Sequence, residues 1–142
     1  MNQLNFLNKP YFDHGAISKI SQIIEELNIQ RPLICSDPGL EEVGMVNKLR
    51  TYISNETNAS FFNLTPANPT QEAVENALNI YTEEGCDGVI GFGGGSSIDL
   101  GKAVALMANH DGSVLDYSIN EGGIAKINET VPLVAIPTTS GT

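Results

Sequence analysis

Tryptophan is absent from the 142 residues and basic side chains are scarce, with seven lysines and arginines against 17 acidic residues and a net charge of −10. The cations stand singly along the chain, so the sequence offers no basic patch for a nucleic-acid backbone or an anionic membrane. No apolar run approaches the roughly 20 residues of a membrane-spanning helix, and the N-terminus has no basic segment followed by an apolar one. We therefore expect a cytoplasmic protein that binds neither nucleic acid nor membrane.

Cysteine and histidine are also too sparse to indicate a disulfide framework or a metal centre. Cys35 and Cys86 lie far apart in the sequence and have no nearby cysteine or histidine, so we expect two small buried thiols in a reducing compartment. His14 and His110 have no carboxylate or histidine partner at the spacing of metal ligands, and such lone histidines are more often surface or capping residues. The sequence predicts no metal site.

The sequence does contain an alternation of helix-like and strand-like segments, over a length typical of one domain. Apolar residues at three- and four-residue steps predict helices over 17–27, 40–53 and 70–85 and from 96 to 108. Short apolar runs predict strands over 32–35, 59–64, 88–92 and 131–136. This order predicts an α/β fold, a Rossmann-like parallel sheet with helices on both faces, forming one domain over 1–142.

Two local signals refine the prediction. Thr70 is a suitable N-cap for the third helix, because its hydroxyl can accept an unpaired backbone N–H, and Gly85 would end that helix. Polar turns also follow three of the strands, with the sequences SDPGL, GGGSSID and PTTSGT. Because the carboxyl ends of parallel strands share one edge, these three turns should gather there, where ligands of such sheets bind.

The glycine-rich stretch GFGGGSSIDLGKAVA has two interpretations. Glycines permit positive φ and a close approach of a ligand, and the first N–H groups of the following helix are unpaired, an arrangement that holds phosphate. The spacing nevertheless departs from G-x-G-x-x-G, since Ile98 replaces the third glycine, and from the P-loop, since Ala103 replaces the magnesium-binding hydroxyl. In the alternative, the glycines form a tight turn and Ser96 with Asp99 caps the helix.

The stretch GFGGGSSIDLGKAVAL together with PLVAIPTTSGT resembles the iron-containing (group III) alcohol dehydrogenases, in their N-terminal cofactor-binding domain within the dehydroquinate synthase-like superfamily. SDPGL and PANPT fall where that family has similar segments, so the resemblance covers the whole chain. Glycerol dehydrogenases share the glycine-rich turn, and maleylacetate reductases are also similar, although their helix start usually lacks the aspartate found here as Asp99. A relative of either remains an alternative.

The resemblance implies a cofactor-binding role for ten residues. Asp37 matches the residue that accepts hydrogen bonds from the adenosine ribose, and a carboxylate there favours NAD over NADP because it repels a 2′-phosphate. Asp37 alone would suggest an Asp-Pro turn, and Asn68 before proline a turn former. The segment that holds the pyrophosphate matches Gly94, Gly95, Ser96 and Ser97. Further positions beside the cofactor match Asn68, Asp99, Thr138, Thr139 and Thr142.

The resemblance also implies what the rest of such an enzyme would contain. In the family, Fe(II) or Zn(II) is held by an aspartate and three histidines in a helical second domain that follows the TTSGT segment. We expect this chain to be truncated before that domain, to take part in hydride exchange between a primary alcohol or aldehyde and the cofactor only as part of a longer protein, and to be inactive alone. A homodimer is an expected arrangement, and a non-catalytic nucleotide-binding module or a purely structural domain remains an alternative.

Overall fold

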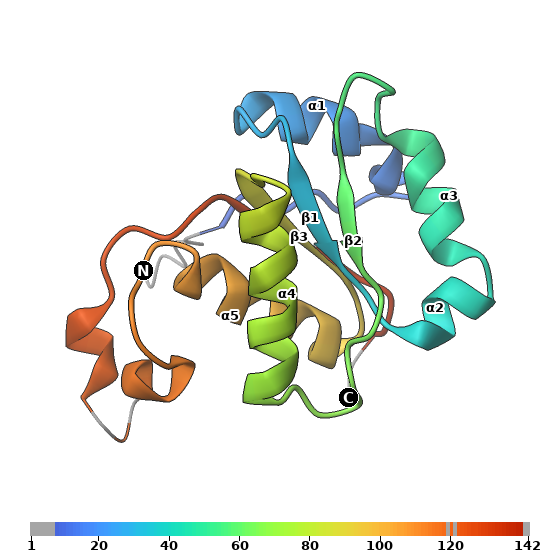
Figure 1. Ribbon diagram of the computed structural model, residues 1–142. Coiled ribbons are helices and arrows are strands. Elements are labelled where there is room, and N and C mark those ends of the chain that lie inside the picture. Colours follow the sequence, from blue (N-terminus) through green and yellow to red (C-terminus); the bar gives the residue numbers. More distant parts are fainter. Residues whose placement is uncertain (1–7, 119, 121, 141–142) are drawn as a thin grey trace, which may run out of the picture.

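The computed structural model describes residues 8–118, 120 and 122–140. At its centre is a four-stranded parallel sheet in the order β2-β1-β3-β4, in which the strands are Pro32–Cys35 (β1), Ser60–Phe62 (β2), Gly88–Gly93 (β3) and Leu133–Pro137 (β4) (Figure 1). In the register of the sheet, Leu33 lies opposite Ser60 and Val89, and Val89 lies opposite Leu133. The parallel α/β fold expected from the sequence is confirmed.

Helices connect the strands and flank them. In chain order they are η1 (Ala16–Lys19), α1 (Ile20–Glu26), α2 (Pro38–Glu42), α3 (Met45–Tyr52), α4 (Gln71–Glu83), α5 (Gly95–Met107), η2 (Val114–Tyr117) and η4 (Gly123–Lys126). In the part of the chain that the structure describes, none of them is both long enough and apolar enough to cross a membrane.

Helices cover both faces of the sheet (Figure 1). Successive strand residues point to opposite faces, so the buried strands supply two cores. Leu33 and Val89 contribute to the core under α4 and α5. Ile34 and Ile90 contribute to the core under α1 and α3. All six residues of β3 are buried, which makes it the central strand around which both cores are organised.

The ends of α4 are those that the sequence predicted. The side chain of Thr70 accepts a hydrogen bond from the backbone N–H of Ala73 at 3.2 Å, and Glu72 lies in the first turn. After the last turn Gly85 adopts a positive φ of 61°, which a residue without a Cβ atom reaches at little cost.

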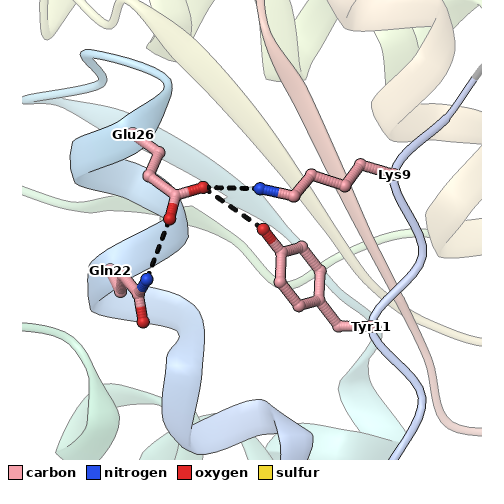
Figure 2. A network of polar contacts seen from close by, with 4 residues as sticks. All are labelled: Lys9, Tyr11, Gln22 and Glu26. Carbon is pink, nitrogen blue, oxygen red and sulfur yellow. Dashed lines mark hydrogen bonds and ion pairs between the residues drawn. The ribbon is translucent and has the colours of Figure 1, made fainter.

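A polar network fastens the segment before α1 to that helix (Figure 2). Lys9 Nζ and the Tyr11 hydroxyl both donate to Glu26 Oε2, at 3.0 and 3.2 Å, while Gln22 Nε2 donates to Oε1 at 2.8 Å. The hydrogen bond from Lys9 holds the pKa of the Glu26 carboxyl below its ordinary value. All four side chains are in contact with solvent, so the network orients the segment more than it stabilises the fold.

The helix expected over 40–53 is wrong as one element. It is divided into α2 and α3 because Gly44 adopts the left-handed conformation, with φ 75°, and a helix cannot continue through it. Val43, which the apolar pattern placed on the buried stripe, is 71% exposed. Leu40 and Val46, which lie on either side of the break, nevertheless both pack on the core under α1 and α3, as the apolar spacing predicts.

Three further expectations need correction. The segment 59–64 forms only the three-residue β2, and because β2 is an edge strand Ser60 and Phe61 are half-buried rather than buried. Cys35 is buried as expected, but Cys86 precedes β3 at the rim of the sheet and is half-buried. The last strand begins at Leu133, later than expected, and includes Pro137.

Candidate functional site

The connections from β1 and from β3 lead toward opposite edges of the sheet. From β1 it proceeds outward to β2, and from β3 it proceeds outward to β4 on the opposite side. The segments that follow β1 and β3 therefore diverge, and in open α/β sheets the crevice at such a point is where ligands bind. Asp37 follows β1 and the glycine-rich turn follows β3, so both lie at this crevice.

The amino end of α5 is open to an anion. Its N-cap is Gly94, which has no side chain to accept a hydrogen bond, and the first bond within the helix runs from Ile98 N–H to Gly94 O at 3.2 Å. The N–H groups of Gly95, Ser96 and Ser97 consequently have no acceptor within the helix. A Cβ atom on Gly95 would meet nothing within 4 Å, so free space lies over the turn.

The interpretation of Ser96 and Asp99 as a capping box is wrong. The hydroxyl of Ser96 donates to the backbone carbonyl of Ala67 instead of accepting from its own helix. The carboxylate of Asp99 pairs with Lys102 Nζ at 3.1 Å on the exposed side of α5. Neither side chain occupies the helix end, which leaves its N–H groups and the positive end of its dipole available.

Asp37 lies against the glycine-rich turn. Its Oδ2 accepts a hydrogen bond from the hydroxyl of Ser97 at 3.3 Å, and its Oδ1 accepts one from the backbone N–H of Leu40 at 3.1 Å. The second contact makes Asp37 the N-cap of α2, with Pro38 in the first turn, so it begins a helix rather than a simple turn. The structure thus brings together two residues that are 60 positions apart in the sequence.

The loop after β2 reaches the same place through Ser96. Its hydroxyl contacts the carbonyl of Ala67, and the next residue, Asn68, is exposed. A groove of about 520 Å³ lies on the far side of this loop, next to α4, with Pro66 and Thr70 in its lining. None of the predicted site residues lines that groove. The candidate site is the edge around the glycine-rich turn, where Asp37, Ala67 and Thr139 approach it.

The segment after β4 closes the opposite side. Thr138 N–H donates to Gly93 O at 2.9 Å, which continues the pairing of β4 with β3. The side chain of Thr139 lies beside Gly94, where an added Cβ would be 3.6 Å from its methyl group. Thr142, the third predicted hydroxyl, lies outside the described residues.

The predicted site residues thus fall into two groups. The glycine-rich turn contacts all three neighbouring loops, through Asp37, Ala67 and Thr139. Asp99 is one turn further along α5 and exposed, and its side-chain hydrogen bond within the described part of the chain goes to Lys102 and not to another predicted residue.

The sequence analysis did not single out Gly93. A Cβ atom there would lie 2.6 Å from Ser97 Oγ and 3.0 Å from Asp37 Oδ2, and its φ of 149° is one that other residues rarely adopt. The residue is therefore required for the approach of Asp37 to α5. The glycine run itself contained this signal, but the run does not indicate which glycine faces which neighbour.

Buried polar atoms also lie near this edge of the sheet. Ser36 and Thr65 are 0% and 2% exposed, and among the described residues their hydroxyls have no hydrogen-bond partner. Their backbones are joined, since Thr65 N–H donates to Ser36 O at 3.1 Å. One residue earlier, burial raises the pKa of the Cys35 thiol to about 12, so this cysteine stays protonated at neutral pH and supplies no thiolate.

The described residues contain no group of three or more histidine, cysteine or acidic side chains placed to hold a metal ion. His110, one of the two histidines, has another function. Its Nδ1 donates to Leu106 O at 2.7 Å and its Nε2 accepts from Asn128 N–H at 2.8 Å, so the ring joins the end of α5 to the loop that precedes β4.

Comparison with known proteins identifies the family. The model for "Iron-containing alcohol dehydrogenase" matches residues 8–142. The chain belongs to the iron-containing alcohol dehydrogenase family. The resemblance inferred from the glycine-rich turn and the PTTSGT segment is thereby confirmed.

Individual members of the iron-containing alcohol dehydrogenase family are similar over nearly the whole chain. A 4-hydroxybutyrate dehydrogenase of Cupriavidus necator is 40% identical over 138 residues, which are 96% of this chain and 36% of that protein. The NADH-dependent butanol dehydrogenase A of Thermotoga maritima is 26% identical, with a TM-score of 0.80 over 97% of this chain and 35% of its own. The sulfoacetaldehyde reductase of Bifidobacterium kashiwanohense, solved in complex with NAD⁺, is 27% identical, with a TM-score of 0.78 over 90% of this chain and 33% of its own. The chain therefore spans about a third of the length of these relatives.

Proposed function

We propose that this chain is the NAD-binding part of an iron-dependent alcohol dehydrogenase. The observation that carries the proposal is the glycine-rich turn, in which the N–H groups of Gly95, Ser96 and Ser97 have no acceptor within their helix and which contacts the loops after β1, β2 and β4. A pyrophosphate placed over Gly95 would accept hydrogen bonds from those N–H groups and lie at the positive end of the α5 dipole. The NAD⁺ complex of the sulfoacetaldehyde reductase supports the choice of ligand.

The other predicted residues would surround the rest of the cofactor. We propose that Asp37 accepts hydrogen bonds from the adenosine ribose, and that Thr138 and Thr139 line the opposite side of the site. Thr142, outside the described residues, is proposed only as a further hydroxyl donor to the cofactor. We propose Asn68 at the rim of the site, because it follows Ala67, whose carbonyl accepts a hydrogen bond from the Ser96 hydroxyl. Asp99 is the least supported member of the set, because it points to Lys102 on the exposed side of α5.

The reaction of the complete enzyme is proposed as hydride exchange between a primary alcohol or aldehyde and nicotinamide, the chemistry that bound NAD supplies at its C4 atom. This chain would bind and orient the dinucleotide. Following the family resemblance, we place Fe(II) or Zn(II) in the helical second domain of a longer protein. Within the described residues no three histidine, cysteine or acidic side chains come together to hold a metal ion, and we assign no step through the metal to this chain. We expect the 142-residue chain alone to show no turnover.

A calorimetric titration of the 142-residue chain tests the proposal. We expect NAD and ADP-ribose, which share the pyrophosphate and the adenosine ribose, to bind more tightly than ATP. Equal binding of all three would favour a general nucleotide-binding module, and binding of none would contradict the proposal.

We also propose a cytoplasmic location and a homodimer. Two free cysteines, one of them half-buried, suit a reducing compartment, although they do not identify one. Sedimentation of the chain at several concentrations measures the oligomeric state, and a monomer at all of them would contradict the dimer for this chain.

A further inference from the structure

The hydroxyl of Ser97 is placed to act on a neighbouring residue. Ser97 is in the first turn of α5 and only 1% exposed. Its Oγ donates to Asp37 Oδ2 at 3.3 Å, which joins the start of α5 to the segment that follows β1. Serine side chains often hydrogen-bond to nearby backbone groups, whereas this hydroxyl bonds to a side chain on another element.

Asp37 is held from two directions. Leu40 N–H donates to Oδ1 at 3.1 Å from the start of α2, and Ser97 donates to Oδ2 from the start of α5. Two donors on different oxygens fix the side-chain torsions of the carboxylate. An ionised carboxylate has about four acceptor positions, so about two remain for hydroxyl groups of a ligand.

The backbone of β3 makes room for this pair. A Cβ atom on Gly93 would lie 2.6 Å from Ser97 Oγ and 3.0 Å from Asp37 Oδ2, and both contacts are too short to be tolerated without movement. The lack of a side chain at Gly93, the last residue of β3, therefore leaves space for the contact between Ser97 and Asp37.

We propose that Ser97 is a positioning residue that sets the preference for NAD over NADP through Asp37. The inference rests on the proposed function, in which Asp37 faces the adenosine ribose. A free 2′-hydroxyl can donate to a carboxylate held in one orientation, whereas a 2′-phosphate brings a like charge to the same fixed position. Without the Ser97 hydroxyl the Asp37 carboxylate can rotate away from the ribose. This weakens both its hydrogen bond with the 2′-hydroxyl of NAD and its charge repulsion of the 2′-phosphate of NADP.

The test measures the dissociation constants of NAD and NADP for the 142-residue chain by calorimetry. In Ser97→Ala we expect the ratio of the two constants to shift by about tenfold toward NADP, the effect of one hydrogen bond to a charged group. Ser97→Thr, which keeps the hydroxyl, should retain the ratio. Ser18→Ala, which removes an exposed hydroxyl bonded to Gly15 O, is the control and should also retain it.

A double-mutant cycle separates positioning from a general structural effect. If Ser97 acts through Asp37, Ser97→Ala should leave the ratio unchanged in the Asp37→Asn background, where the charge is already absent. Unfolding midpoints are measured first, and Ser97→Cys, a weak donor of similar size, replaces Ser97→Ala if that variant does not fold.

The outcomes distinguish this inference from the proposed function. Three results would overturn the inference: Ser97→Ala leaves the ratio of the NAD and NADP dissociation constants unchanged, Ser97→Ala shifts the ratio equally in the Asp37→Asn background, or the wild-type chain shows no preference for NAD. In each case NAD binding would still support the proposed function. Failure of the unchanged chain to bind either dinucleotide would overturn both.

Discussion

A Cβ atom placed on Gly101 of α5 would lie 3.1 Å from the Cα atom of Gly91 in β3, so the helix and the central strand approach each other at a pair of glycines. Gly91 would itself bring a Cβ within 3.1 Å of the Ile98 Cα atom. This close approach packs the middle of α5 against the middle of β3. The glycines of the segment therefore serve different purposes, and substitutions can separate them.

Gly95→Ala should weaken NAD binding without lowering stability. Its Cβ would enter the free space over the turn, where the proposed pyrophosphate lies, but would touch no protein atom within 4 Å. We expect an affinity loss of at least tenfold by calorimetry and a change in the free energy of unfolding within about 0.5 kcal/mol.

Gly101→Ala is the matched variant with the opposite expectation. Its Cβ would press on backbone atoms, so we expect a loss of about 1–3 kcal/mol in the free energy of unfolding from urea titration. Undiminished NAD affinity in Gly95→Ala would contradict the location of the pyrophosphate.

Thr65→Val should be tolerated, because among the described residues the buried hydroxyl of Thr65 has no hydrogen-bond partner. Replacing an unpaired buried hydroxyl by a methyl group is expected to leave stability unchanged or to raise it by about 1 kcal/mol. Thr70→Val is the control, since it removes the N-cap of α4 and should cost about 1 kcal/mol. A clear loss of stability in Thr65→Val would indicate that the hydroxyl has a partner, such as a buried water.

His110→Ala should detach the loop before β4 from the end of α5. The variant loses the hydrogen bonds to Leu106 O and from Asn128 N–H, for an expected cost of about 1–3 kcal/mol in the free energy of unfolding. Amide exchange at Asn128 should become faster. His14→Ala, at an exposed position, should change stability by less than about 0.5 kcal/mol, and an equal effect of the two variants would contradict the role of His110.

Stability should fall at alkaline pH through the buried thiol of Cys35. Burial raises its pKa from the usual 9.0 to about 12, so the unfolded chain loses this proton at a lower pH than the folded one. The stabilisation is complete below pH 9.0 and is lost as the pH rises toward 12. Tyr81, whose pKa burial also raises to about 12, acts in the same direction.

Urea titrations between pH 8 and 10.5 measure this effect. Cys35→Val should show a shallower decline of the free energy of unfolding than the unchanged chain, because it has no thiol to ionise. Cys86→Ala, at a half-buried position, is the comparison. Equal slopes in Cys35→Val and the unchanged chain would contradict the assignment.

The strands and the meeting of their polar turns could be predicted from the sequence, because both depend on local composition and on the geometry of parallel sheets. The break between α2 and α3 at Gly44 could not be predicted. The apolar spacing of Leu40, Val43 and Val46 continues across Gly44, and such spacing does not indicate that a residue has a positive φ. The half-buried state of Cys86 was missed as well, because it lies in the connection between α4 and β3 and not within the buried strand.

The sequence named the proposed members of the candidate site, but it could not supply the contacts that the structure shows between them and their neighbours. Gly94, Gly95, Ser96 and Ser97 were found from the glycine run and from a family resemblance. The partners of the two hydroxyls, Ala67 for Ser96 and Asp37 for Ser97, are 29 and 60 positions away and depend on the packing of whole elements. The local sequence suggested a capping role for Ser96, because the actual partner of its hydroxyl, the carbonyl of Ala67, is distant in the sequence.

Strand β4 forms one border of the described sheet, and its middle residue, Ala135, faces solvent. Such a border is a template to which a strand of another molecule can add. Pro137 has no N–H to offer there, and ten surplus negative charges repel an approaching copy. Added salt screens this charge repulsion. Self-association of the protein should therefore increase with ionic strength, whereas association through opposite charges decreases with ionic strength.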